Sequence, residues 1–364
     1  MPHSTRRAAL RATLRDRELD ALLVTNLLNV RYLTGFTGSN AALLVHADSD
    51  DATVFCTDGR YLTQAAAQVP DLERVIDRPC DAVLVERAAR QNGARTGRVG
   101  FESRHVTVDG LDVLTDAADG TELVPAPDLV ERLRLVKDDA EVEALRMACA
   151  AADRALAGLV EHGGLRPGRS EKEVARELES RMLDHGAAGR AFESIVATGA
   201  NSAVPHHRPT DALVRDGDFV KLDFGALVDG YHSDMTRTVV VGRAADWQRE
   251  LYQLVAASQA AGRAALAVGT PYADVDAAAR GVIEEAGHGD EFLHGLGHGV
   301  GLQIHEAPAL SKAGDGTLLP GMAVTVEPGV YLAGKGGVRI EDTLVVREGA
   351  PELLTLTTKE LVVI

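Results

Sequence analysis

Short apolar runs and helical periodicity alternate along the first third of the chain. Residues 6–18 place Ala and Leu among arginines at helical spacing, and apolar runs follow at 21–25, 41–46 and 52–57. This order predicts a helix followed by strands. The same mixed pattern continues to about residue 127, where two prolines interrupt it. We therefore predict an α/β N-terminal domain over residues 1–133.

The remaining residues, 134–364, are expected to form an α+β domain. Residues 129–163 carry apolar positions three and four apart and predict a helical linker that enters a long helix, and Ser170 opens a further helix. From about residue 192 the pattern changes to period two, which is typical of strands. A helical segment over 245–286 interrupts this strand-rich half.

Composition supports a folded two-domain protein. The chain has 364 residues, of which 45% are hydrophobic and 25% charged, so it can bury a substantial core. Its 54 acidic and 38 basic residues leave a formal charge of −16. Such a charge repels nucleic acid and anionic membranes, so we expect neither as a partner.

The cysteines and the N-terminus point to a cytoplasmic protein. Three cysteines, Cys56, Cys80 and Cys149, are widely spaced and lack a CxxC pair, so we interpret them as reduced core thiols. The N-terminus has no uninterrupted apolar segment of the signal-peptide type, and no window reaches the roughly 18 apolar residues of a membrane span.

Two aspartates flank a glycine-containing turn in KLDFGALVDGYHSDMTRTVVV. Asp223 and Asp234 stand eleven residues apart on strand-like segments, and a hairpin can bring them together. Asp223 lies within an apolar run, where an isolated carboxylate is costly and needs a compensating charge. The alternative is a surface hairpin with two turn-facing aspartates.

Three histidines, His294, His298 and His305, occur in HGLGHGVGLQIHEAP among four glycines. Glycines at this density let the backbone approach a ligand closely. The spacing matches neither HExxH nor a zinc finger. A lone histidine is usually structural, whereas three in one glycine-rich turn favour a site.

Two glutamates complete the set of candidate acids. Glu327 and Glu341 lie in β-like apolar runs, where glutamate is depleted. Each could be an edge-strand charge, and Glu341 could pair with Arg339. Together with the two aspartates they carry −4, which two divalent ions would balance, and one imidazole would join the ligands. Manganese, cobalt, iron and zinc all suit such a site.

Two segments resemble nucleotide-binding motifs, but the surrounding sequence does not support nucleotide binding. DFG at 223–225 has no accompanying kinase loops, and GLGHGVG does not match GxGxxG or open a βαβ unit.

The ordered motifs resemble a known family. LDFG, SDMTRT, GHGVG, VEPGVY and VRIED, over about residues 140–364, closely resemble the pita-bread metallopeptidases, which include methionine aminopeptidase, prolidase and aminopeptidase P. RYLTGFTGSNAALLV and TDGRYLTQAA resemble the creatinase/prolidase-type N-terminal domain, which methionine aminopeptidases generally lack. The resemblance implies a pita-bread catalytic domain and specificity for proline. FTGS and TDGRY are more similar to aminopeptidase P than to prolidase.

The resemblance implies a role for each metal ligand. Asp223 would chelate one metal, Asp234 and Glu341 would bridge both, and His298 with Glu327 would complete the other. We expect two divalent ions, manganese foremost, with cobalt, zinc or iron as alternatives. A hydroxide would lie between them, and Glu327 would act as the catalytic proton shuttle.

Other residues would contact the substrate. The resemblance gives His206 and His305 catalytic positions near the scissile bond and makes His294 part of the proline pocket. Tyr331 and Arg339 would orient substrate or the acidic cluster, although Arg339 could equally be an ion-pair partner of a ligand carboxylate. The adjacent His207 is expected at the surface.

The resulting hypothesis is a cytoplasmic Xaa-Pro aminopeptidase that releases the residue before proline from peptides. Prolidase, which cuts only Xaa-Pro dipeptides, is the main alternative. A non-catalytic homologue would have lost ligands, and a creatinase-like hydrolase without metal would leave four carboxylates repelling one another. A homodimer is expected from the family alone.

Overall fold

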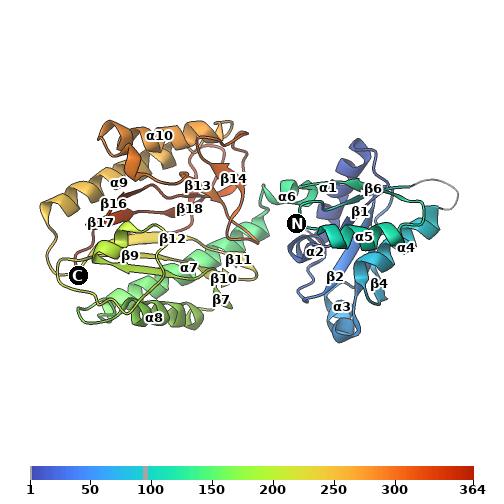
Figure 1. Cartoon of the computed structure of the whole chain (residues 1–364), viewed down its shortest axis with the longest axis horizontal. Helices are drawn as coiled ribbons and strands as arrows, with labels where there is room; N and C mark the ends of the chain where they lie inside the picture. The colour runs from blue at the N-terminus through green and yellow to red at the C-terminus, as the bar shows by residue number, and fades with distance from the viewer. Residues whose placement is uncertain (1, 93–96) are drawn as a thin grey trace. The chain divides into compact units, whose positions relative to one another are not determined.

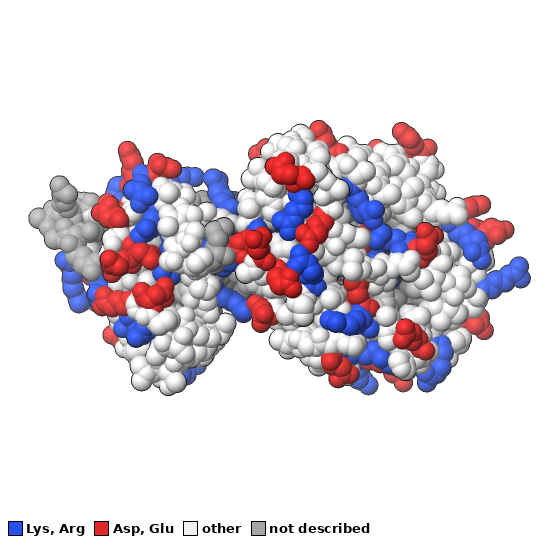
Figure 2. Space-filling view, turned by 180° about the vertical axis from the view of Figure 1, so that it is seen from behind, with Lys and Arg blue, Asp and Glu red and all other residues white. Residues whose placement is uncertain are grey.

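The computed structural model describes residues 2–92 and 97–364, which form two compact units, residues 1–134 and 135–364 (Figure 1). On the face shown in Figure 2, acidic and basic side chains intermingle over each unit, so the acidic excess is spread over that face. None of the helices in the described residues is long and apolar enough to cross a membrane.

The N-terminal unit is built on a six-stranded sheet in the order β4-β3-β2-β1-β5-β6. The pairs β1–β5, β5–β6 and β3–β4 are parallel, and β2 runs antiparallel to β1 and β3. The central strands β1, β2 and β3 are almost wholly buried, as continuous apolar runs predict. The strands are β1 (Ala21–Val24), β2 (Ala41–His46), β3 (Val54–Thr57), β4 (Glu73–Ile76), β5 (Arg98–Phe101) and β6 (Glu122–Pro125). The helices are α1 (His3–Asp16), α2 (Leu27–Thr34), η1 (Gly59–Tyr61), α3 (Leu62–Gln68), α4 (Cys80–Asn92), α5 (Val108–Ala117) and α6 (Leu129–Arg134).

The C-terminal unit places strands between two pairs of helices (Figure 1). Helices α7 (Asp139–Glu161) and α8 (Glu171–Asp184) share one apolar core with β8 (Ile195–Thr198), β9 (Phe219–Phe224) and β12 (Met235–Val240). Helices α9 (Asp246–Ala264) and α10 (Tyr272–Glu285) share a second core with β15 (Ala323–Val326) and β18 (Asp342–Val345). The other elements are β7 (Gly189–Arg190), η2 (Gly199–Ala203), β10 (Ala226–Val228), β11 (Tyr231–His232), η3 (Gly289–Glu291), β13 (Gly297–Gly299), β14 (Glu306–Leu310), β16 (Gly329–Leu332), β17 (Gly336–Arg339) and β19 (Glu352–Leu353).

Local chemistry sets where these helices begin. Ser170 caps α8 in a capping box with Glu173, and Asp138 caps α7 in the same way with Glu141. The helical segment predicted over 245–286 is divided into two helices, because residues 265–271 contain Gly269 in a left-handed conformation and Pro271 at the start of α10.

Candidate metal centre

The two aspartates come from one antiparallel pair of strands. Asp223 lies near the end of β9, opposite Thr236 of β12, and Asp234 immediately precedes β12. Gly225 permits this close return of the chain, because a β-carbon at that position would lie 1.8 Å from the carbonyl oxygen of Ser233. The predicted hairpin therefore brings both carboxylates to one end of the strand pair.

The other three candidates come from a five-stranded sheet in the order β14-β13-β15-β18-β19. His298 lies on β13, Glu327 directly follows β15, and Glu341 directly precedes β18. Gly297 is required here, since a β-carbon would lie 2.1 Å from the carbonyl oxygen of Thr325. Adjacent strands thus present an imidazole and two carboxylates at the same place.

All five side chains line one cavity of about 260 Å³. The Nε2 atom of His298 lies 3.3 Å from Oε1 of Glu327 and 3.6 Å from Oδ2 of Asp234. Asp234, His298 and Glu341 each offer a ligand atom within 4.8 Å of the other two. The structure therefore brings together residues that span Asp223 to Glu341 in the sequence.

The carboxylates of the cluster perturb one another. Burial and then the negative charge of Glu341 raise the pKa of Asp234 well above its ordinary value. Burial and then the charge of Glu327 do the same to the pKa of Glu341. Burial would also raise the pKa of Glu327, but the hydrogen bond and charge of His298 outweigh it and bring that pKa to about 2. A cation in the cluster would relieve this repulsion.

Two carboxylate oxygens in this cluster also lack a partner. Oδ1 of Asp223 and Oε1 of Glu341 are buried and accept no hydrogen bond from the described residues. A buried oxygen of this kind normally has a protein, water or ion partner. Four carboxylates and one imidazole are ligands that divalent metals accept, so the residues present fit a metal centre.

A hydrogen-bonded network stands behind the cluster. Arg339 donates to Asp223 through Nη2 and to the Tyr331 hydroxyl through Nη1 at 2.7 Å. The same hydroxyl lies 2.8 Å from Nε2 of His294. Burial raises the pKa of Tyr331 to about 12, so it remains a hydroxyl at neutral pH. None of these three side chains is among the described residues that line the cavity, so their contact with substrate stays a prediction, while Arg339 orients Asp223.

The other predicted histidines behave differently from one another. His305 and His206 both line the cavity, and the ring of His305 lies 4.3 Å from that of His298, centroid to centroid. The prediction that His207 lies at the surface is wrong. Its side chain is only 11% exposed and its Nε2 lies 2.8 Å from Oε2 of Glu171, which is fully buried. Glu171, at the start of α8, thus holds the loop that carries His207. The sequence analysis missed this role, because the sequence around Glu171 resembles an ordinary helix N-terminus.

Lys221 is a second residue that the sequence analysis missed. It lies on β9 two positions before Asp223, is fully buried, and its Nζ donates to the carbonyl oxygens of Val204 at 2.6 Å and Pro205 at 3.2 Å. These bonds anchor the segment that leads to His206. The sequence did contain a sign of this role, because a lysine inside the apolar run FVKLDF is unusual and needs buried partners.

Comparisons with known proteins agree with this geometry. The model of Metallopeptidase family M24 matches residues 143–348, and that of the Creatinase/Prolidase N-terminal domain matches residues 6–136. The chain is 34% identical to a Xaa-Pro dipeptidase of Pyrococcus furiosus over 95% of this chain and 96% of that protein. Among solved structures, it is similar to a Xaa-Pro dipeptidase from Bacillus anthracis (TM-score 0.93, 38% identity, 100% of both chains). It is also similar to an X-Pro aminopeptidase from Thermotoga maritima (TM-score 0.88, 32% identity, 98% of both chains).

Proposed function

The chain belongs to metallopeptidase family M24, and on this premise we propose that it hydrolyses the peptide bond that precedes proline in short peptides. The observation that carries the proposal is the buried cluster of four carboxylates and His298 at the wall of a cavity of about 260 Å³. Relatives whose names specify Xaa-Pro substrates match nearly the whole chain, which supports the specificity for proline.

The cluster would hold two divalent ions, manganese foremost, with cobalt, zinc and iron as alternatives. We assign their binding to Asp223, Asp234, His298, Glu327 and Glu341. When bound, such ions lower the pKa of a coordinated water and polarise the scissile carbonyl. The two unpartnered oxygens, on Asp223 and Glu341, are the strongest support for a cation at this place.

Glu327 is the proton carrier in this proposal. With a pKa of about 2 its carboxylate is ionised at neutral pH, so an Oε atom can accept a proton from water and pass it to the leaving proline nitrogen. Thr325 and His298 fix its orientation, because Oε1 accepts a hydrogen bond of 3.2 Å from the Thr325 hydroxyl and lies 3.3 Å from His298 Nε2.

His305 would stabilise the substrate oxygen. Burial and then the charge of His298 lower the pKa of His305, so its ring is neutral at pH 7 and one nitrogen still donates a hydrogen bond. A donor aimed at the carbonyl oxygen favours the tetrahedral state over the planar substrate. His206 also lines the cavity and would bind the substrate. It follows the segment that Lys221 anchors.

The cavity favours a dipeptide as the substrate. Among the described residues that line it, Arg208 is the one with a permanent positive charge, and its side chain is 89% exposed. A guanidinium at that place can pair with the free carboxylate of an Xaa-Pro dipeptide. Phe192, Pro209 and Ile304 provide apolar surface for the proline ring. We therefore place the dipeptidase reaction ahead of the aminopeptidase reaction.

The aminopeptidase reaction remains the second candidate. The FTGS and TDGRY segments and the likeness to the Thermotoga maritima aminopeptidase favour it. In a longer peptide an amide would replace the free carboxylate, and Arg208 would keep only its ion pair with Glu193, at 3.7 Å.

One experiment tests both reactions. Chelated protein is reloaded with manganese, cobalt or zinc and given Xaa-Pro dipeptides and Xaa-Pro-Xaa tripeptides. Activity confined to dipeptides, with a raised KM in Arg208→Ala but not in the exposed control Arg243→Ala, supports the dipeptidase. Equal cleavage of tripeptides supports the aminopeptidase. Folded protein that no metal activates on either substrate would overturn the proposal.

A further inference from the structure

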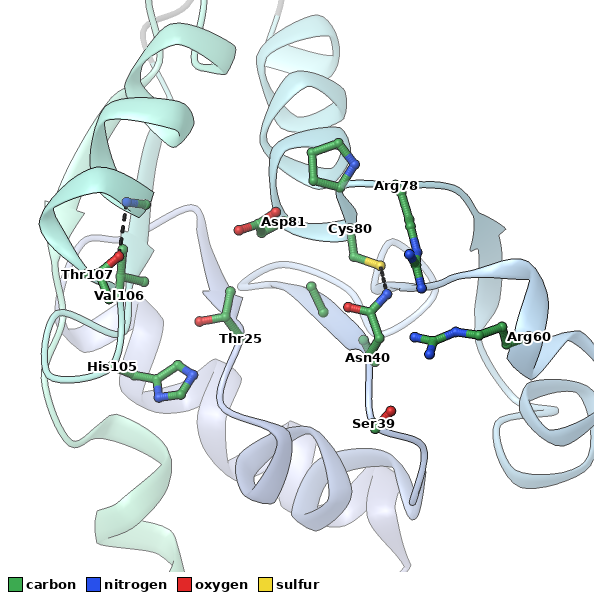
Figure 3. Close-up of a pocket in the computed structure, with 14 residues that line it drawn as sticks. Thr25, Ser39, Asn40, Arg60, Arg78, Cys80, Asp81, His105, Val106 and Thr107 are labelled. Carbon is green, nitrogen blue, oxygen red and sulfur yellow. Dashed lines mark hydrogen bonds between the residues drawn. The ribbon is translucent and has the colours of Figure 1, made fainter.

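A cavity of about 800 Å³ lies in the N-terminal unit. Strands β1, β3, β4 and β5 run in one direction, so their carboxyl ends meet at one edge, where the antiparallel β2 begins. The cavity opens at this edge, where α/β sheets commonly bind ligands. Figure 3 shows Thr25 after β1, Arg60 after β3, Arg78 after β4 and His105 after β5 around it.

Two thiols meet at the wall of this cavity. Cys80 is the first residue of α4 and lines the cavity, with 6% of its surface exposed, whereas Cys56 on β3 is fully buried. The Sγ atoms of Cys80 and Cys56 lie 3.5 Å and 4.0 Å from the same carbonyl oxygen, that of Asp77. One thiol therefore faces the cavity and the other lies behind it.

The surroundings make the two thiols chemically unequal. A hydrogen bond from Cys56 lowers the pKa of Cys80, and so does a hydrogen bond of 3.4 Å from the side-chain amide of Asn40 (Figure 3). Burial and the charges of Asp58 and Asp81 oppose this shift but do not reverse it. Its place at a helix N-terminus also favours a thiolate. The same hydrogen bond, together with burial, raises the pKa of Cys56. Its place at the cavity wall and its lowered pKa make Cys80 the more nucleophilic of the two thiols, and the raised pKa keeps Cys56 protonated beside it.

We propose that Cys80 and Cys56 form a peroxide-reactive dithiol, in which Cys80 reacts first and Cys56 resolves the product. The Cys80 thiolate attacks one oxygen of hydrogen peroxide and breaks the O–O bond, which gives a sulfenic acid and, after protonation, water. The thiol of Cys56 then attacks the Cys80 sulfur. A disulfide forms, the S–O bond breaks, and the hydroxyl group leaves as a second water with the Cys56 proton. Peroxide is reduced by two electrons, and the two thiols are oxidised.

The test uses the full chain and hydrogen peroxide as the probe. After a brief exposure and quenching by alkylation, peptide mapping by mass spectrometry should find Cys56 joined to Cys80, with the loss of two hydrogens. Cys149 provides an internal control, because burial raises its pKa well above the ordinary value. It should stay a free thiol, and Cys149→Ala should oxidise at the wild-type rate.

Two further measurements separate the roles of the thiols. In Cys56→Ser the reaction should stop at a sulfenic acid on Cys80 that dimedone traps. If that variant does not fold, alkylation of native wild-type protein still tests the proposal, because Cys80 should react at least about 10-fold faster than Cys149. Equal rates for Cys80 and Cys149, or oxidation without a Cys56–Cys80 bond in the wild type, would overturn it.

Discussion

Replacing Gly225 by alanine tests whether the close approach of Gly225 to Ser233 is needed to build the metal centre. The added β-carbon would stand 1.8 Å from the carbonyl oxygen of Ser233, whereas real contacts of this kind stay beyond 3.0 Å. The opposing atom belongs to the backbone, so no side-chain rotation relieves the overlap. The segment that carries Asp234 must move away from Asp223 by more than about 1 Å, as expected when a close-packed site is overfilled.

The expected losses of stability and activity follow from this displacement. Overfilling a packed site costs about 1–3 kcal/mol, and each kcal/mol lowers the melting temperature of a domain of this size by roughly 2–4 °C, so we expect a loss of about 2–12 °C. Catalytic groups misplaced by about 1 Å typically lose on the order of 100-fold in rate. The activity of Gly225→Ala should therefore fall by at least that factor.

Thermal unfolding followed by circular dichroism, metal titration by calorimetry and Xaa-Pro hydrolysis provide the readouts. Gly281→Ala in α10 is the matched control, since its β-carbon would meet nothing within 4 Å. Alanine is the better helix former by up to about 1 kcal/mol, so this control should melt slightly higher and keep full activity. Our account of the glycine is refuted if Gly225→Ala matches the control in melting temperature, metal affinity and rate.

Three further predictions concern the charges of the site. Glu327→Gln removes the carboxylate that we propose accepts the proton, so kcat should fall by about 10²–10⁴ in folded protein, and an effect on KM alone would contradict the proposed role. Arg339→Met leaves Asp223 buried without its ionic partner, so the free energy of unfolding of chelated protein should drop by about 3–5 kcal/mol in urea, and a drop below about 1 kcal/mol would argue against the pair. Asp234 and Glu341 have raised pKa values, so the folded state binds protons more tightly than the unfolded state, and metal-free protein should lose stability as pH rises above the ordinary carboxyl values. The gain in melting temperature on adding metal should consequently be larger at about pH 8 than at about pH 5, and equal gains would refute this linkage.

Much of the fold could be predicted because it depends on local pattern. The α/β N-terminal domain followed by an α+β pita-bread domain is confirmed, and the family resemblance rested on motifs that all lie in their expected order. Asp223 and Asp234 were predictable as a pair, since eleven residues and one hairpin join them. Their meeting with Glu341 was inferred from charge balance and from the resemblance, because no local pattern specifies contacts between distant strands.

Other parts of the site depend on tertiary packing that the sequence does not display. The Glu171–His207 contact joins a helix start to a loop 36 residues later, and nothing in either segment signals the other. The cysteines were interpreted as separate core thiols. Cys56 and Cys80 meet because β3 and β4 are parallel neighbours and α4 begins after β4, which brings the two residues to one side of the cavity.

The division of the ligands between two parts of the C-terminal unit has a consequence for engineering. Asp223 and Asp234 precede α9, whereas His298, Glu327 and Glu341 follow α10. A chain cut in the loop at 265–271 would yield one fragment with two ligands and another with three. Because residues of both fragments build the apolar core around α9 and α10, packing would hold the fragments together, and recovery of metal binding would report that the split enzyme had reassembled.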